Sequence, residues 1–263
     1  MSKETKHEVA VYDQNQSRFL ALRPENEMME AMEANGESVS FANLTKVKTP
    51  SGDSTTWMID TPYGEPEATR DICGAFVLYQ KQGLLWPSDE FDGSGAKPVL
   101  KSFDMRTAFR VDDTDDIGDL DEGVLAEAEL AQRDQLGRRQ YDLSKLHYNQ
   151  WGSGNEGSGK RFKEQRVLGI LPFGEMLPLI ITVQPGSLAS VTKTIGLLQV
   201  PHYRTIVHAN LLTKANAKGV KYPQINLTFE REFIQKPESD ILKQRYTDPL
   251  KSAMLAEDVS FEE

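Results

Sequence analysis

The segment from Tyr148 to Arg166 combines glycines, aromatic rings and basic side chains. Within it, Gly154, Gly159 and Lys160 have the G-x-x-x-x-G-K spacing of a phosphate-binding P-loop. That motif needs a Ser or Thr after the Lys to hold magnesium, and here the residue is Arg161. The motif also follows a buried strand, whereas the residues before this loop are polar. The spacing therefore does not predict nucleotide hydrolysis.

The same residue types suit single-stranded nucleic acid. Glycines let backbone amides approach an anion, and Lys and Arg neutralise phosphates without reading sequence. Aromatic rings give bases a surface for stacking, which contributes about 1–3 kcal/mol per base. The alternative is that Trp151 packs into the core and the glycines only shape a turn. We predict nucleic-acid contacts from Tyr148, Trp151, Lys160, Arg161, Lys163, Arg166, Tyr203, Arg204, Lys214, Lys218, Lys221 and Tyr222.

Other arrangements that could support catalysis or metal binding are incomplete. The acidic run 111–122 matches an EF-hand loop in part, but Ile117 and Val124 occupy two ligand positions. The single cysteine, Cys73, excludes an all-cysteine zinc site. The histidines show no i, i+4 pair and have no cysteine near them in sequence, and no G-x-S-x-G elbow is present. We therefore predict no enzyme activity, no cofactor and no metal.

Charge is unevenly distributed along a chain whose formal net charge is -10. Residues 176–229 contain no Asp or Glu, whereas acids concentrate at 111–122 and at 256–263. A basic region inside an acidic chain indicates an anionic partner, although a buried sheet that excludes acids would have the same composition. The acidic end predicts a tail that covers a basic groove until nucleic acid displaces it and that recruits partners; a frayed helix end is the alternative.

Local patterns predict the elements that must position these residues. We expect a short helix at 24–36, two strands in 72–88 around a Gln82–Gly83 turn, and a helix at 122–140. Further strands are expected at 38–48, 166–173, 176–184, 203–215 and 225–234, with a helix at 185–200 and a terminal helix at 237–257 that Pro249 divides. The sum predicts a β-rich α+β fold with an open β-barrel core of the oligonucleotide-binding type, an inserted helix and flanking helices.

This pattern divides the chain into three parts. They are an N-terminal extension at 1–70, a β-rich core at 71–235 that includes the acidic loop 111–122, and a helix with an acidic tail at 236–263. The most apolar stretch, 169–183, contains Pro172, Glu175 and Pro178 and falls short of the roughly 20 apolar residues of a membrane span. The start has no apolar segment typical of a signal peptide. We therefore expect no membrane association.

The stretch DLSKLHYNQWGSGNEGSGKRFKEQR, residues 142–166, resembles a segment of bacteriophage-encoded proteins that belong to replication and recombination modules. Those proteins have two cysteines two apart, then N-Q-W/F-G-S, a glycine stretch and G-K-x-C-K-x-x-R. Their later features resemble MLPLII, QPGSLASV and the paired strands at 202–229, so the likeness covers roughly residues 72–230. The family's four cysteine positions appear here as Leu100, Leu143, Leu146 and Phe162.

The resemblance implies a non-enzymatic single-stranded DNA-binding protein that acts in phage DNA replication and recombination, in the cytoplasm of the infected bacterial host. Its partners would be single-stranded DNA and replication or repair proteins bound by the acidic C-terminus. The sequence leaves open whether the chain forms a homo-oligomer. Where the family has cysteines, we expect the four apolar residues to form a metal-free cluster beneath the loop. The alternative function is a protein-interaction module that binds a host or phage protein through its acidic surface.

Overall fold

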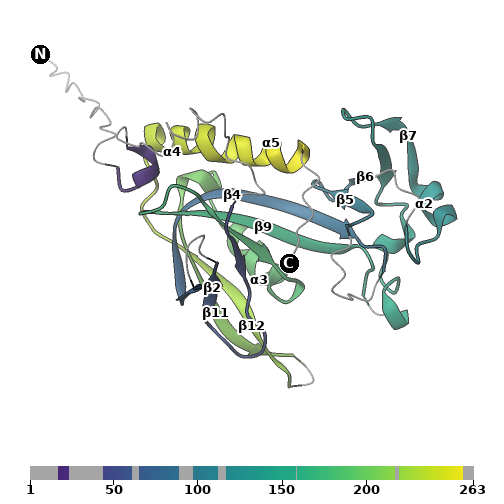
Figure 1. Ribbon diagram of the computed structural model, residues 1–263, viewed down its shortest axis with the longest axis horizontal. Coiled ribbons are helices and arrows are strands. Elements are labelled where there is room, and N and C mark those ends of the chain that lie inside the picture. The colour runs from purple at the N-terminus through teal and green to yellow at the C-terminus, as the bar shows by residue number, and fades with distance from the viewer. Residues whose placement is uncertain are drawn as a thin grey trace, which may run out of the picture.

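The computed structural model describes residues 17–23, 44–60, 65–88, 97–111, 117–157, 159–216 and 219–256. The fold is α+β and rich in sheet, with one large mixed sheet in the order β3-β2-β1-β10-β9-β4-β5-β6-β8-β7 (Figure 1). This sheet is open, so the predicted barrel of the oligonucleotide-binding type is not confirmed. The predicted helix at 24–36, the centre of the acidic run and the acidic tail lie outside the described residues.

The long strand β4 (Asp71–Leu85) is the axis of the sheet, and the prediction of two strands around a Gln82–Gly83 turn is wrong. β9 (Lys163–Pro172) pairs with β4 from Gly74 to Leu84, which keeps β4 extended through Gly83. The glycine serves close packing there, because an added Cβ would lie 2.2 Å from the ring of Phe162. Glycine in a sequence is typical of a turn, but Gly83 lies within a strand, where the ring of Phe162 leaves no room for a side chain.

The sheet divides along one edge of β4 into two lobes. Near its start β4 pairs with β11 (Ile206–Ala215), and near its end it pairs with β5 (Leu100–Ser102). The large lobe contains β11, β12 (Lys221–Phe229), β10 (Leu179–Val183), β1 (Lys46–Lys48), β2 (Trp57–Ile59) and β3 (Glu67–Thr69). The small lobe contains β5, β6 (Thr107–Arg110), α2 (Glu122–Ala128), β7 (Glu129–Arg133) and β8 (Arg139–Asp142).

The large lobe curls around its own core, and α3 (Pro185–Ile195) fills the open side. The buried indole of Trp57 donates from Nε1 to the backbone oxygen of Ala209 at 3.3 Å, which joins β2 to β11 without strand pairing. On β12, the backbone N–H of Ile225 donates to the Ser187 hydroxyl of α3 at 2.9 Å. The helix therefore covers a strand edge that has no β-partner among the described strands, and the predicted helix in this region is confirmed.

The terminal helical segment lies along the long β4–β9 ribbon (Figure 1). It runs through α4 (Lys236–Leu242), the π-helical turn η7 (Lys243–Thr247) and α5 (Asp248–Ala256). Pro249 cannot donate a backbone N–H, and the wider turn directly before it accommodates that gap without ending the helix. Thr247 donates to the backbone oxygen of Val77 at 2.6 Å, which fixes the segment to β4. No helix in the described ranges is long and apolar enough to cross a membrane.

The small lobe corrects the predicted helix at 122–140. Asp121 caps the helix start by accepting from the backbone N–H of Gly123 at 2.7 Å, but α2 ends at Ala128 and the chain continues as β7. Leu136, which the helical pattern places on the apolar face, is 60% exposed. It lies in a hairpin turn where Asp134 accepts from the backbone of Arg138 and Gly137 has φ +79°. Asp134 and Gly137 therefore favour a turn at this point, although the apolar residues of the segment have helical spacing.

Candidate nucleic-acid interface

The loop from Tyr148 to Phe162 joins β8 to β9 and is closed by its own backbone. Phe162 donates its N–H to the oxygen of Tyr148 at 2.9 Å, and Gly152 donates to the oxygen of Gly159 at 2.6 Å. Gly152 and Gly159 have φ of +89° and +59°, a region that residues with a side chain rarely adopt. The glycines therefore shape a compact turn, and we call this segment the indole loop.

Trp151 lies at the tip of the indole loop with 81% of its surface exposed. The alternative interpretation, that Trp151 packs into the core, is wrong, and its ring is open to a ligand. The loop beneath it is fixed, because Arg161 donates its backbone N–H to the Ser153 hydroxyl at 3.1 Å and Asn149 donates to the backbone oxygen of Leu143 at 2.9 Å. An aromatic ring presented on a fixed loop loses little conformational entropy on binding.

Tyr148 does not share this exposure. Its ring is buried, and its phenol oxygen accepts the backbone N–H of Asp121 at 2.7 Å. The guanidinium carbon of Arg161 lies 5.2 Å from the ring centroid. The side chain thus ties the loop to the start of α2, and the predicted role of Tyr148 in base stacking is corrected to a role in positioning.

Two of the predicted phosphate ligands are buried and bonded within the protein. Arg161 pairs with Asp119 and donates to the backbone oxygen of Pro87 at 3.0 Å. Arg166 donates from Nε to the hydroxyl of Tyr79 at 3.1 Å and pairs with Glu164. A buried guanidinium needs such partners because desolvating an unpaired charge is costly. These two arginines therefore hold the fold, and their positive charge is offset where it lies.

Lys160 of the indole loop and Lys163, which directly follows the loop, are the cations nearest the surface in this region. Lys160 is half-buried and donates to Oδ1 of Asn149 at 3.3 Å, and Lys163 is exposed at the start of β9. Gly159, the neighbour of Lys160, lies against the indole, since an added Cβ would be 3.9 Å from Cζ3 of Trp151. The structure therefore brings one lysine and the exposed ring of Trp151 onto the same loop.

A second group of predicted residues lies on the β11–β12 hairpin. Lys214 is opposite Tyr222 in the register, and Lys221 lies 3.9 Å from Asp53. The Tyr222 ring packs against Gly186 of α3, where an added Cβ would be 3.1 Å away. Tyr203 and Arg204 are half-buried in the short helix η6 (His202–Arg204). Lys218 lies outside the described residues.

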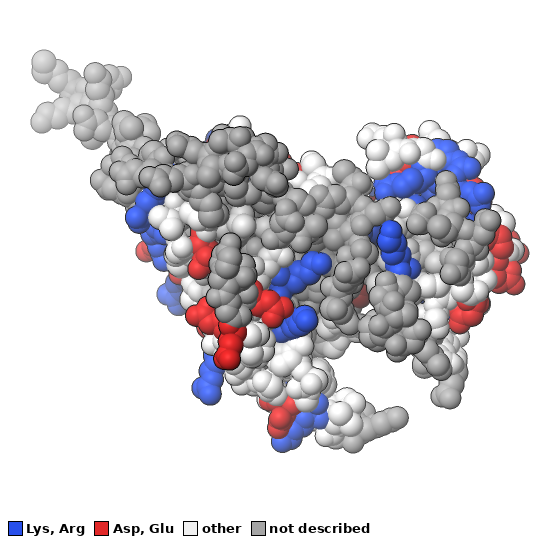
Figure 2. Space-filling view, in the orientation of Figure 1, with Lys and Arg blue, Asp and Glu red and all other residues white. Residues whose placement is uncertain are grey.

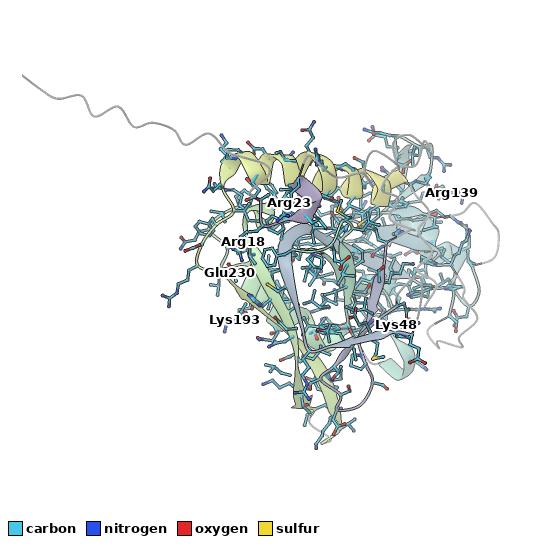
Figure 3. The ribbon with its side chains drawn as sticks, turned by 60° about the vertical axis from the view of Figure 1, so that its left-hand side comes forward. Arg18, Arg23, Lys48, Arg139, Lys193 and Glu230 are labelled. Atoms are coloured by element: carbon cyan, nitrogen blue, oxygen red, sulfur yellow. The ribbon has the colours of Figure 1, made fainter. Side chains whose placement is uncertain are left out.

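The two groups are attached near opposite ends of β4. The hairpin continues past the start of β4, where Asn210 pairs with Asp71, and the indole loop enters at the other end, where Lys163 pairs with Leu84. At about 3.3 Å per residue, roughly 40 Å of curved strand separates these points. Figure 2 shows Lys and Arg side chains in several separate places on one face. In Figure 3, Arg18 and Lys193 lie on one side of the molecule and Arg139 lies on the other.

The expected apolar cluster beneath the loop is confirmed. Leu100, Leu143, Leu146 and Phe162 belong to one core, and none is more than 2% exposed. Tyr148 packs in the same core. The shared burial concerns these side chains and does not test the resemblance to the phage proteins.

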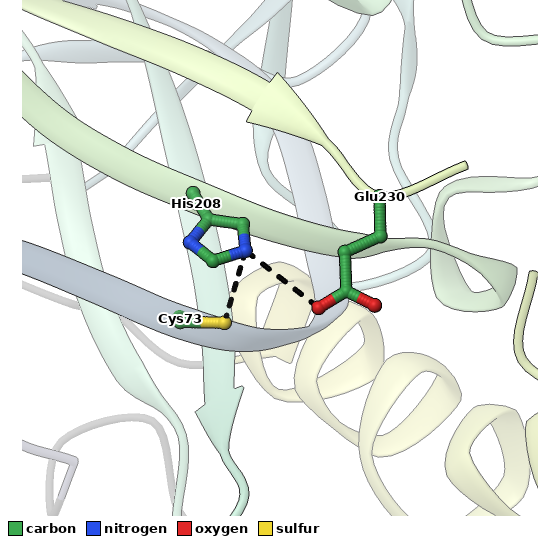
Figure 4. A group of neighbouring side chains, drawn as sticks. All are labelled: Cys73, His208 and Glu230. Carbon is green, nitrogen blue, oxygen red and sulfur yellow. Dashed lines mark hydrogen bonds and ion pairs between the residues drawn. The ribbon is translucent and has the colours of Figure 1, made fainter. Parts of the chain in front are cut away.

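A group of potential metal ligands lies on the large lobe, and the spacing of these residues in the sequence did not predict it. Cys73, His208 and Glu230 each offer one ligand atom, and these atoms lie within 4.8 Å of one another (Figure 4). Cys73 and His208 are 135 residues apart and meet because β4 pairs with β11. Alternation in each strand predicts which face each side chain occupies, but it does not indicate which strands are neighbours.

Comparisons with family models, with curated proteins and with solved structures gave no match.

Proposed function

We propose that this protein binds single-stranded DNA through the indole loop, without catalysing a reaction, and that it acts in phage DNA replication and recombination. Trp151 stacks on a base, and Lys160 and Lys163 contact the neighbouring phosphates. The observation that carries the proposal is the 81% exposed indole on a loop closed by its own hydrogen bonds. A large aromatic ring held in water on a fixed support is suited to stacking, which gains about 1–3 kcal/mol per base.

The remaining predicted residues take different parts in the proposal. Arg161, Arg166 and Tyr148 position the loop from beneath. Lys214, Lys221 and Tyr222 on the β11–β12 hairpin contact a strand long enough to reach both lobes. Arg204 and Tyr203, half-buried in η6, contribute at most their exposed atoms.

The proposal includes the finer fold assignment, the setting and the partners. We infer that the curled large lobe is an unclosed variant of the oligonucleotide-binding barrel. Support comes from the bond between Trp57 and Ala209 across unpaired strands and from α3, which fills the remaining gap. The setting is the cytoplasm of an infected bacterial host, where the acidic C-terminus recruits replication or repair proteins.

Tryptophan fluorescence tests the proposal directly. The full chain is titrated with oligothymidylate at low and at moderate salt, and the expected result is quenching that weakens as salt rises, because released counterions drive such binding. Of the two other tryptophans, Trp57 is buried and gives a constant background, and the half-buried Trp86 is replaced by Phe so that quenching reports on Trp151. The Trp151→Phe variant, followed by fluorescence anisotropy of labelled DNA, should retain most of the affinity. Unchanged fluorescence and anisotropy at low salt would rule out DNA binding by this loop.

One observation supports the alternative function, a protein-interaction module. α2 and β7 expose acidic side chains, among them Glu127 and Glu129. Under this alternative the chain gives no anisotropy change with DNA. Instead, charge reversal at those two residues reduces capture of a defined basic partner protein and leaves DNA titrations as they were.

A further inference from the structure

The face of the sheet opposite the large-lobe core carries Cys73, His208 and Glu230 at the junction of three strands. Cys73 on β4 is the register partner of His208 on β11, and Glu230 directly follows β12. The backbone N–H of Glu230 donates to the oxygen of Ile206 at 3.0 Å, which fixes the end of β12 beside them. Sγ of Cys73 lies 3.4 Å from Nε2 of His208, and that nitrogen lies 3.6 Å from Oε1 of Glu230 (Figure 4).

A fourth residue orients the histidine. Oδ2 of Asp71 lies 3.0 Å from Nδ1 of His208. A carboxylate at that position accepts a hydrogen bond, which favours the tautomer with the hydrogen on Nδ1 and leaves Nε2 to face Cys73 and Glu230 as a ligand atom. Asp71 is two residues before Cys73 on β4, so strand alternation places both on one face. A carboxylate behind a histidine is the arrangement that orients ligands in many metal sites.

We propose that Cys73, His208 and Glu230 bind a Zn²⁺ ion, with Asp71 holding His208 in the ligating tautomer. Bond lengths of about 2.0–2.3 Å around a tetrahedral zinc place neighbouring ligand atoms about 3.3–3.6 Å apart. Two of the separations, 3.4 and 3.6 Å, agree with that geometry. The third pair, Sγ and Oε1, lies within 4.8 Å and must close slightly around the ion. Sulfur and imidazole ligands select zinc over magnesium or calcium.

The charges around the site suit a cation better than a reactive thiolate. Carboxylate oxygens of Asp71 and Glu230 lie 3.0 and 3.6 Å from the two ring nitrogens of His208, so negative charge gathers where a cation would bind. Glu230 uses its second oxygen, Oε2, to face Arg18 at 3.5 Å, which leaves Oε1 for the ion. Three protein ligands leave the fourth position of a tetrahedral zinc for water, as in zinc sites that exchange ligands. The zinc site shares no residue with the indole loop. A negative zinc-binding result would therefore not bear on DNA binding, and a negative DNA-binding result would not bear on zinc.

The first test is zinc stoichiometry on the purified full chain after dialysis against zinc and then against metal-free buffer. One zinc per chain is expected. Cys73→Ser and His208→Gln should weaken binding by at least about 100-fold, and Asp71→Asn by about 10–100-fold. The matched control is His147→Gln, because His147 is an exposed histidine on the small lobe. Stoichiometric zinc that persists in both Cys73→Ser and His208→Gln would overturn the proposal.

A second test needs no variant. Because Cys73 is the single cysteine in the chain, thiolate ligation of Co²⁺ must produce a sulfur-to-cobalt charge-transfer absorption that belongs to this residue. Zinc should also slow alkylation of Cys73 by iodoacetamide at least tenfold. A wild-type chain that shows neither the absorption nor the protection does not hold a metal at this site.

Discussion

The ring of Phe162 occupies the space that a side chain on Gly83 would need, with an added Cβ only 2.2 Å from the ring. This contact joins the indole loop to the axis of the sheet, because Phe162 ends the loop and Gly83 lies in β4. The position of the exposed Trp151 thus depends on a glycine far from it in sequence.

Gly83→Ala should destabilise the fold by about 1–3 kcal/mol, because the ring of Phe162 is rigid and the core around it is closed. Urea unfolding measures the change. Gly174→Ala is the matched control, since no atom of the described residues lies within 4 Å of its added Cβ, and it should have little effect. Phe162→Leu in the Gly83→Ala background should recover part of the loss, whereas equal stability of the two single glycine variants would contradict this packing.

Trp151→Ala should weaken binding of oligothymidylate by about 1–3 kcal/mol, the contribution of one stacked base. Because the side chain is 81% exposed, the stability of the fold should hardly change. Leu197→Ala, at a similarly exposed apolar residue after α3, controls for lost surface area and should leave affinity intact. Anisotropy of labelled DNA gives the affinities, and an equal loss in both variants would remove the role of the indole.

Replacing Lys160 and Lys163 together by Ala should flatten the dependence of affinity on salt. Each phosphate contact to a single strand contributes about 0.7 to the slope of log K against log salt, so the slope should fall by about 1.4. Lys193→Ala, an exposed lysine on α3, should leave the slope unchanged. A slope that stays the same in the double variant would show that these lysines do not contact phosphates.

His202 should make the fold less stable as the solution becomes acidic. Burial, helped by the nearby charge of Lys251, lowers the pKa of His202 from 6.5 to about 4. Between pH 6.5 and pH 4 the imidazole of His202 is protonated in the unfolded chain and neutral in the folded chain. The free energy of unfolding is therefore highest above pH 6.5 and decreases as the pH falls toward 4. The loss reaches about 3 kcal/mol at most.

The control for this pH effect is His202→Gln, which should flatten the decline between pH 6.5 and 4.5 in urea unfolding. Carboxylates titrate equally in both chains, so their contribution cancels in the difference. Parallel pH profiles of the two proteins would show that His202 is not the group responsible.

Local pattern in the amino-acid sequence was sufficient for elements whose period is clear and whose ends are marked. α3 begins at Pro185 as its entry signal predicts, and β9, β10 and β11 lie within or close to the predicted ranges, whereas β12 (Lys221–Phe229) begins and ends four to five residues before the predicted strand at 225–234. These elements depend on hydrophobic period and backbone preference, which neighbouring residues determine. The cluster of Leu100, Leu143, Leu146 and Phe162 was expected from the resemblance to the phage proteins, and the four side chains are buried in one core.

Tertiary structure alone decided which polar groups meet. Arg161 and Arg166 have the residue type of phosphate ligands, but Asp119 and Tyr79 from other segments hold them inside the fold. Cys73 and His208 carry no signal at either position, and only the pairing of β4 with β11 brings them together. The physical reason is that burial, charge pairing and ligand geometry depend on distances through space, which strand order sets and local sequence does not.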